Sequence, residues 1–229
     1  MKLYLSSYRL GNNSDEFADF VAGQKRVGVI RNALDFSDDP DRLQEGLERE
    51  FSDLKGLGFA PQAIDLRDYF FDKKDLRPVM DQLDGLWVVG GNSFILNSAF
   101  HQSGLDKILV EQLENETFVY AGYSAGICVL TPTLEGIHLA DNPELIPQGY
   151  PDEVIWKGLG LLPFCIAPHW RSDHPESAMI DDSVEYFMEH KIPFIALKDG
   201  ETYITDLREM PNHLMVVRAT AAPSPTAAS

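Results

Sequence analysis

Short apolar runs alternate with helix-like patterns along the chain. Each run is bounded by polar residues or glycine, which is typical of strands buried in a sheet. The expected strands span residues 3–5, 27–30, 63–66, 86–89, 118–122, 164–167 and 194–197. Helical patterns separate several of these strands, notably over residues 93–114 and 181–190.

The best-defined helix follows the second expected strand. Asp39 is its expected N-cap, and Pro40 stands in the first turn, where a missing N–H costs nothing. Apolar residues then recur every three or four positions and mark one buried face, namely Leu43, Leu47, Phe51 and Leu54. Gly58 is expected to end the helix.

Unbroken apolar strands separated by helices indicate a parallel sheet covered on both faces. We therefore predict an α/β fold, doubly wound and three-layered. Residues 202–205 and 214–217 are expected to pair as a C-terminal β-hairpin. Residues 1–218 form one expected domain, and the small, proline-containing residues 219–229 form an expected disordered tail.

Composition and charge narrow the class of protein. Of the 229 residues, 44% are hydrophobic and 24% are charged, as in ordinary globular proteins. Acidic residues outnumber basic ones 36 to 19, and the net charge of −17 opposes binding to nucleic acid or anionic membranes. The first residues become polar too early for a signal peptide, and no apolar run approaches the roughly 18 residues of a membrane span. We expect a soluble, cytoplasmic protein.

Residues 122–126 have the sequence GYSAG, which matches the G-x-S-x-G pattern of a nucleophile elbow. The apolar run FVYA leads directly into it and ICVL follows as a helix start, which is the context that an elbow requires. Ser124 would then stand as a nucleophile beside the free N–H groups of the next helix. The alternative is a glycine-rich turn that only links a strand to a helix.

A second glycine turn, Gly90-Gly91-Asn92-Ser93, follows the strand LWVV. Both turns lie at the carboxyl ends of parallel strands, and therefore at the edge of the sheet where ligands bind. Gly91 could donate its backbone N–H to the same oxyanion as Ala125, with Asn92 beside the substrate. The alternative is an ordinary loop in which Asn92 caps the next helix.

A serine nucleophile needs a base, and His169 is the best placed of the six histidines. The apolar run FCIAP brings it to a strand end, although a histidine there can equally be structural, and His138 is a rival. The acid that orients the imidazole is expected to be Asp141, after the elbow, or Glu201, after the strand FIAL. Glu135 is a weaker candidate, and each of these acids could simply be a solvated surface carboxylate.

Three blocks together resemble peptidase family S51, which includes dipeptidase E (alpha-aspartyl dipeptidase) and cyanophycinase. They are VVGGNSFIL at 88–96, YAGYSAGICVLTPT at 120–133 and GLGLLPFCIAPHW at 158–170, with KDGETYIT at 198–205 as a weaker fourth. An elbow with a GGN turn upstream and a PH-aromatic strand end downstream is far more specific than the elbow alone.

The resemblance implies a serine peptidase that needs no metal or cofactor, on a fold akin to class I glutamine amidotransferases. By position, Ser124 matches the nucleophile of the family and His169 its general base, while Gly91 and Ala125 match its oxyanion donors. The implied reaction proceeds through an acyl-enzyme that water then hydrolyses.

The resemblance leaves the acid open. Dipeptidase E-like members have it after the elbow helix, which points to Asp141, the first choice, and cyanophycinase-like members have a glutamate at the position of Glu201. Family members cleave after an N-terminal aspartate or cleave aspartyl bonds in cyanophycin. The expected partner is therefore a small peptide, and the expected state is a monomer or homodimer.

An aspartyl substrate brings a carboxylate to a strongly acidic protein, so a local cation must hold it. Arg171 is the best candidate, because it lies two residues beyond His169 and its planar guanidinium suits bidentate binding. The alternative is that Arg171 pairs with Asp173 or Glu176 on the surface.

Three other functions share parts of this pattern. An α/β-hydrolase esterase has the same elbow but usually has several more strands before the histidine, whereas 45 residues separate Ser124 from His169. A glutamine amidotransferase needs a cysteine nucleophile, and Cys128 lies one helical turn beyond the elbow. With Cys165 it is one of two cysteines, which are too few for a disulfide scaffold and lack metal-ligand spacing. A catalytically inert binder of a small acidic ligand remains the third alternative.

Overall fold

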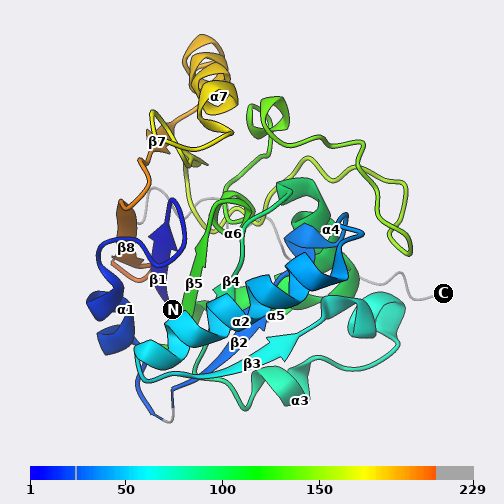
Figure 1. Cartoon of the computed structure of the whole chain (residues 1–229), viewed down its shortest axis with the longest axis vertical. Helices are drawn as coiled ribbons and strands as arrows, with labels where there is room; N and C mark the ends of the chain where they lie inside the picture. Colours follow the sequence, from blue (N-terminus) through cyan, green and yellow to red (C-terminus); the bar gives the residue numbers. More distant parts are fainter. Residues whose placement is uncertain (24, 210–229) are drawn as a thin grey trace, which may run out of the picture.

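The computed structural model describes residues 1–23 and 25–209. Its centre is a six-stranded sheet with the order β3-β2-β4-β5-β1-β8 (Figure 1). The strands are β1 (Lys2–Ser6), β2 (Arg26–Ile30), β3 (Ala60–Ile64), β4 (Gly85–Val88), β5 (Val119–Tyr123) and β8 (Thr202–Asp206). The first five are parallel to one another, and β8 pairs antiparallel with β1.

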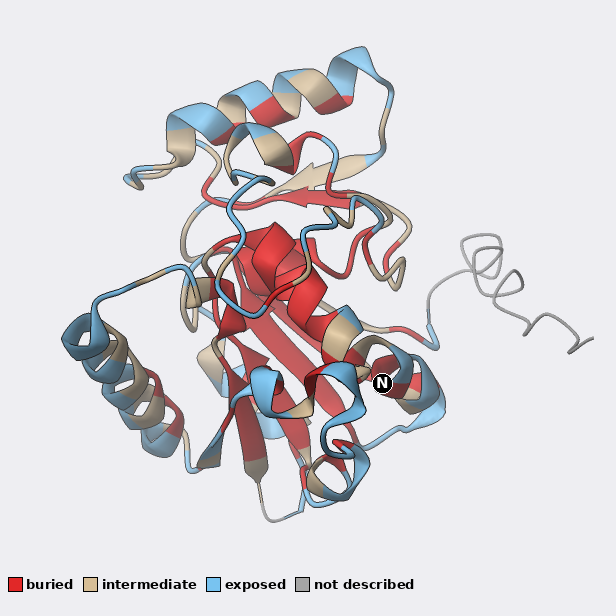
Figure 2. Cartoon of the chain, turned by 90° about the vertical axis from the view of Figure 1, so that its right-hand side faces the viewer, coloured by how far each residue is buried: buried red, intermediate tan, exposed pale blue. Residues whose placement is uncertain are grey.

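Alternate side chains of each strand pack on opposite faces of this sheet. In β4, Leu86 and Val88 belong to one apolar core and Trp87 belongs to the other. Figure 2 shows the buried strands between helices whose outer faces are exposed. The predicted three-layer, doubly wound α/β fold is therefore confirmed, and it follows from strands that are apolar on both faces.

The two helical layers are built from different parts of the chain. The Trp87 side is covered by α1 (Ser14–Phe20) and α2 (Pro40–Gly56). The opposite side is covered by α3 (Arg77–Met80), α4 (Ser93–Ser103), α5 (Leu105–Glu111) and the one-turn helix α6 (Ala125–Cys128). Gly104, at φ 74°, separates α4 from α5 where the sequence predicts one continuous helix. No helix of the described segments is both long and apolar enough to cross a membrane.

Helix α2 begins as predicted. Pro40 occupies its first turn, and the backbone N–H of Arg42 donates to Asp39 Oδ1 over 2.9 Å. The helix ends at Gly56, and Gly58 follows with φ 82°, a conformation that glycine adopts without strain.

One acid on α2 lies within the core, which the apolar pattern does not predict. Glu50 is 2% exposed and accepts hydrogen bonds from Trp87 Nε1 (2.8 Å) and from the Tyr123 hydroxyl (3.0 Å). These two donors satisfy a carboxylate that would otherwise be costly to bury. Since Tyr123 is the last residue of β5, the contact ties α2 to the strand that carries the expected nucleophile.

A second, two-stranded sheet lies beside the first. It pairs β6 (Cys165–Ala167) with β7 (Phe194–Ala196) in parallel, and α7 (Ser177–Glu189) connects them. Figure 1 shows β7 and α7 at the top of the molecule, beyond the carboxyl ends of the main strands. The sequence predicts both strands, but it does not predict that they form a sheet of their own.

Three predicted segments differ from the structure or lie outside it. The third strand begins at Ala60, three residues earlier than predicted, because as an edge strand it buries only Ile64 and lacks a fully apolar run. Strand β8 is the first half of the predicted hairpin. Residues 214–217, its expected partner, and the expected tail at 219–229 lie outside the described residues.

Candidate active site

Ser124 stands on a strained turn between β5 and α6. Its φ of 50° and ψ of −119° are rare for a residue with a side chain, and such strain clusters at functional sites. The turn packs tightly on β4, because a Cβ on Gly126 would lie 2.3 Å from the carbonyl oxygen of Val88. The glycine pattern therefore has a steric reason, and the strand–turn–helix context predicted from GYSAG is observed.

The second glycine turn lies against the first. A Cβ on Gly90 would lie 2.8 Å from Cβ of Ser124, so only glycine allows this approach. Gly91 follows with φ 141°, also a conformation that other residues rarely adopt. Neither the Gly91 nor the Ala125 backbone N–H donates a hydrogen bond within residues 1–23 and 25–209. Both amides are thus available to an external acceptor, as oxyanion donors must be.

The Asn92 side chain caps helix α4. Its side-chain oxygen accepts from the backbone N–H groups of Phe94 (2.9 Å) and Ile95 (3.1 Å), and its Nδ2 donates to the Asn142 carbonyl (2.9 Å). The structure therefore gives Asn92 the capping role that the sequence left as the alternative to substrate binding.

His169 follows β6 and is 1% exposed. Its Nδ1 lies 2.7 Å from Oδ1 of Asp199, which follows β7. Because an ionised carboxylate can only accept, Nδ1 carries the proton in this pair. Burial lowers the pKa of His169, and the hydrogen bond to Asp199 offsets only part of this effect. The imidazole is therefore neutral near pH 7, with Nε2 as its unprotonated nitrogen.

The two carboxylates predicted to orient His169 lie elsewhere. The Glu201 carboxylate accepts from the backbone N–H of Lys198 (2.8 Å) within its own turn. Asp141 accepts from the backbone N–H of Ser93 (2.8 Å), at the start of α4. Burial raises the pKa of Asp141 to about 7, which marks a poorly solvated carboxyl group. The carboxylate that contacts His169 is that of Asp199. Asp199 lies in the same segment, KDGET after a strand end, that led the sequence analysis to Glu201.

Ser7, just beyond β1, contacts Ser124, His169 and Asp199. Its carbonyl accepts from the backbone N–H of Ser124 (3.2 Å), and its hydroxyl accepts from the backbone N–H of His169 (2.8 Å). The same hydroxyl lies 3.0 Å from Asp199 Oδ1, to which it can donate. Ser172 Oγ also accepts from the backbone N–H of Asp199 (2.7 Å). Sequence reasoning missed Ser7, because a serine after a strand carries no signal of its own.

A cavity of about 370 Å³ opens over this edge of the sheet, and its wall includes Ser124, Gly91 and His169. Within the described residues no hydrogen bond joins Ser124 Oγ to His169 Nε2. In a structure without substrate, such catalytic contacts are often longer than a hydrogen bond. The expected nucleophile, base and oxyanion donor are thus brought to one cavity, with the base already oriented by Asp199.

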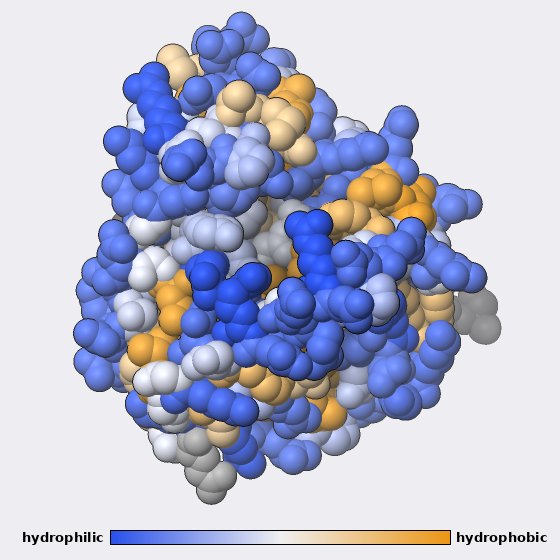
Figure 3. All heavy atoms as spheres, in the orientation of Figure 1, coloured by the Kyte–Doolittle hydropathy of each residue, from blue (hydrophilic) through white to orange (hydrophobic). Residues whose placement is uncertain are grey.

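Three arginines also line the cavity, namely Arg31 from the end of β2 and Arg42 and Arg49 from α2. Figure 3 shows strongly hydrophilic side chains grouped around a hollow near the middle of this face. Arg171, the cation predicted from sequence, is not in the cavity wall, and its guanidinium lies 4.6 Å from the ring centre of Trp170. With φ 49°, Arg171 lies in a turn that directs its side chain onto the neighbouring tryptophan.

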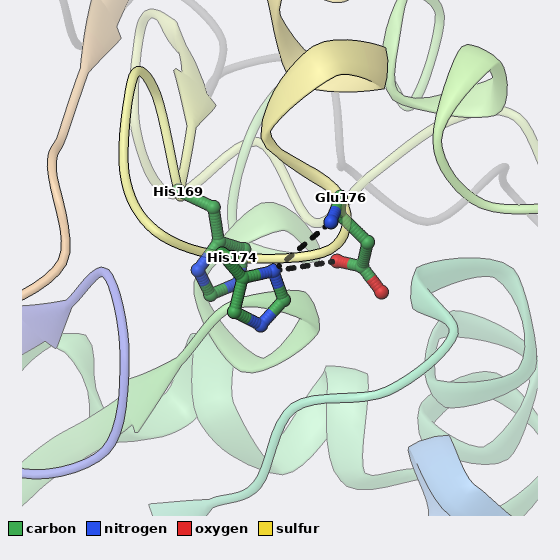
Figure 4. A group of neighbouring side chains, drawn as sticks. All are labelled: His169, His174 and Glu176. Carbon is green, nitrogen blue, oxygen red and sulfur yellow. Dashed lines mark hydrogen bonds and ion pairs between the residues drawn. The ribbon is translucent and has the colours of Figure 1, made fainter.

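His174 and Glu176 complete the wall next to His169 (Figure 4). The rings of His169 and His174 stack 3.7 Å apart at 7°. Burial raises the pKa of Glu176, and the nearby Asp199 adds to this effect. One nitrogen of each histidine and a carboxylate oxygen of Glu176 lie within 4.8 Å of one another, so this group could hold a metal ion.

The rival candidates have other roles. His138 accepts from the backbone N–H of Gly136 (2.9 Å), and its ring packs edge-on against Trp156 and Tyr186. Cys128 is 1% exposed and faces the core one turn beyond Ser124, as the sequence predicts. Burial raises the pKa of its thiol well above the usual range, which makes Cys128 unsuitable as a nucleophile.

Comparisons with known proteins identify a family and several similar sequences. The model of Peptidase family S51 matches residues 6–206. Peptidase E of Streptomyces coelicolor is 32% identical over 126 residues, which are 53% of this chain and 48% of that protein. A probable alpha-aspartyl dipeptidase of Drosophila melanogaster is 27% identical over 133 residues, which are 56% of this chain and 52% of that protein. The chain thus spans about half the length of the curated relatives it matches.

Solved structures show the same fold. A putative Peptidase E protein from Listeria monocytogenes superposes with a TM-score of 0.68 at 19% identity, over 90% of this chain and 98% of that one. A peptidase from an acI-B1 Actinobacterium gives a TM-score of 0.63 at 14% identity, over 89% of this chain and 82% of that one. At these identities the likeness concerns the fold alone.

Proposed function

Because the chain belongs to peptidase family S51, we propose that it is a serine peptidase that hydrolyses short peptides with an N-terminal aspartate. Ser124 is the nucleophile, His169 the general base and Asp199 the acid that orients it. The observation that carries this proposal is the 2.7 Å contact between His169 and Asp199, which leaves Nε2 free at the cavity that Ser124 also lines.

The first half of the reaction forms an acyl-enzyme. His169 Nε2 takes the proton of the Ser124 hydroxyl while Oγ attacks the scissile carbonyl carbon. The carbonyl oxygen becomes an oxyanion held by the free N–H groups of Gly91 and Ala125, and losing one such donor typically costs about 100- to 1000-fold in rate. His169 then gives its proton to the departing amine as the peptide bond breaks.

The second half releases the acyl group. A water molecule takes the place of the departed amine, and His169 Nε2 removes its proton as the water oxygen attacks the ester carbonyl. Collapse of this second tetrahedral intermediate returns the proton to Ser124 and frees the new carboxylate. Throughout, the Asp199 carboxylate accepts from His169 Nδ1 and stabilises the imidazolium that forms twice in each cycle.

The preference for aspartate rests on the arginines of the cavity. A β-carboxylate approaching this acidic protein needs a local cation, and Arg31, Arg42 and Arg49 line the cavity that Ser124 lines. These three take the role that Arg171 was expected to have. The name of the Drosophila relative, probable alpha-aspartyl dipeptidase, is consistent with this substrate.

The test is hydrolysis of aspartyl-leucine and asparaginyl-leucine by the wild-type chain and by Ser124→Ala. We expect the wild type to cleave aspartyl-leucine, and Ser124→Ala to lower kcat by about 10⁶-fold, as loss of a triad serine does elsewhere. Circular dichroism should show an unchanged fold. More than a tenth of the activity left in Ser124→Ala would contradict the proposal. A wild type that binds aspartyl-leucine without cleaving it would identify an inert binder instead.

A further inference from the structure

His169, His174 and Glu176 form a cluster that the peptidase reaction does not explain. Figure 4 shows the two imidazoles facing each other with the Glu176 side chain next to His174. The three potential ligand atoms lie within 4.8 Å of one another, in the wall of the cavity. Hydrolysis needs one histidine, so a second histidine and a carboxylate at this distance call for another explanation.

His169 already has the environment of a metal ligand. A histidine that binds a metal almost always uses its other ring nitrogen to donate to a carboxylate, which fixes the ring and its tautomer. Asp199 accepts from His169 Nδ1 in this way and leaves Nε2 with a free lone pair.

His174 and Glu176 must move to reach a common ion with His169. Nitrogen and oxygen ligands lie about 2.0–2.2 Å from zinc, so ligand atoms around one tetrahedral ion are about 3.4 Å apart. The three atoms here lie within 4.8 Å of one another and must therefore come closer. The His174 and Glu176 side chains, 18% and 36% exposed, lie in the loop that precedes α7 and have room to do so. The His174 ring must also rotate out of its 3.7 Å stack on His169, because the in-plane lone pairs of two parallel rings cannot meet at one ion. His174 then gives up the 3.3 Å contact of its Nδ1 with the Glu176 N–H.

We propose that His169, His174 and Glu176 bind Zn²⁺ reversibly, and that the bound ion inhibits the peptidase. Two imidazoles and one carboxylate, with water as fourth ligand, form a donor set that zinc favours over Mg²⁺ or Ca²⁺. The ion occupies the nitrogen of His169 that must accept the Ser124 proton, so the zinc-bound form cannot start the reaction.

Binding is tested in the Ser124→Ala chain, where no catalysis intervenes. Isothermal titration with Zn²⁺ should give one ion per chain, and Mg²⁺ should not compete. His174→Ala and Glu176→Gln should each weaken zinc binding at least 10-fold. Asp199→Asn should weaken zinc binding by about 10- to 100-fold, as loss of the carboxylate that orients a metal-binding histidine does in other proteins. His101→Ala is the matched control and should change nothing, because His101 is not in the cavity wall and lies 3.2 Å from Asp106 on the surface.

The inhibition rests on the proposed function and is measured separately. Zn²⁺ should inhibit hydrolysis of aspartyl-leucine, and a chelator should restore it. His174→Ala, compared with its own metal-free rate, should need at least 10-fold more Zn²⁺ for half inhibition. Zinc affinity unchanged in both His174→Ala and Glu176→Gln would overturn the site, and tight binding without inhibition would overturn its regulatory role. If the wild type cleaves no peptide but its zinc binding depends on His174, the peptidase proposal fails while the metal site stands.

Discussion

The nucleophile turn and the base–acid pair are held by two different sheets. Ser124 and Gly91 follow β5 and β4, adjacent strands of the main sheet, and a Cβ on Gly90 would clash with Ser124. His169 and Asp199 follow β6 and β7, the two strands of the small sheet. The first arrangement depends on a few consecutive residues, whereas the second depends on how segments 30 residues apart align.

This difference explains why one half of the site is evident in the sequence and the other is not. GYSAG is itself the elbow, and its glycines meet the backbone of β4. Which acid meets His169 depends on the pairing of Ala167 with Ala196 and on the two turns that follow, where Trp170 N–H donates to the Leu197 carbonyl (3.0 Å). Asp199 and Glu201 lie in the same turn, and only this alignment selects between them.

The largest expected effect separates the two acids of this turn. Asp199→Asn should lower kcat about 10⁴-fold, because an amide in place of the carboxylate favours the wrong tautomer of His169. Glu201→Gln should cost less than about 10-fold, since its carboxylate accepts only from the Lys198 N–H. Steady-state hydrolysis of aspartyl-leucine measures both. A reversed order of effects would return the role to Glu201 and contradict the observed pairing.

A smaller effect is expected at the substrate-binding wall. Arg49→Met should raise KM for aspartyl-leucine by about 10- to 100-fold, since a hydrogen bond to a charged group is worth about 1.5–3 kcal/mol. KM for asparaginyl-leucine should change little. Arg171→Met is the matched control, because that guanidinium lies over Trp170, and both substrates should be unaffected. Equal losses on charged and neutral substrates would reject Arg49 as the aspartate-binding cation.

Ser7 connects the two halves, so its loss should loosen their alignment. Ser7→Ala removes the hydroxyl that accepts from the His169 N–H and donates to Asp199. We expect kcat to fall about 10-fold, in line with the 1–3 kcal/mol cost of unpaired buried groups, with KM unchanged. Ser7→Thr keeps the hydroxyl and should restore part of kcat. A change in KM alone, or no recovery in the threonine variant, would mean that Ser7 does not position the base.

The smallest effect on activity is expected at Asp141. The pKa of Asp141 is about 7 in the folded chain, above its ordinary value of 3.8, so the folded state holds this proton more tightly than the unfolded state. Stability is therefore full below pH 4 and falls as pH rises to about 7. The loss is at most about 4 kcal/mol, since each pKa unit corresponds to about 1.4 kcal/mol.

Asp141→Asn keeps an acceptor for the Ser93 N–H without the charge. The variant should therefore be more stable than the wild type at pH 8 and equally stable near pH 4, with nearly unchanged kcat. Urea unfolding at both pH values measures the difference. A loss of kcat near 10⁴-fold would instead make Asp141 the catalytic acid.

Most of the fold and about half of the site residues can be predicted from the sequence. Apolar runs locate the strands because both faces of the main sheet are buried, and the glycine turns locate Ser124 and Gly91. Ser7 could not be predicted, because it meets His169 across 162 residues through the pairing of β1 with β5 and the approach of the small sheet. The cavity arginines could not be predicted either, because in the sequence Arg42 and Arg49 look like ordinary solvated residues of an amphipathic helix.

The most direct test of the account is the rate at which a fluorophosphonate labels Ser124, followed by intact-mass spectrometry and peptide mapping. Labelling requires a serine activated by its base, and it needs no knowledge of the substrate. We expect one label on Ser124 of the wild type, a rate lowered by orders of magnitude in Asp199→Asn, and rates near wild type in Asp141→Asn and Glu201→Gln. An unlabelled wild type, or an Asp199→Asn chain labelled as fast as the wild type, would contradict it.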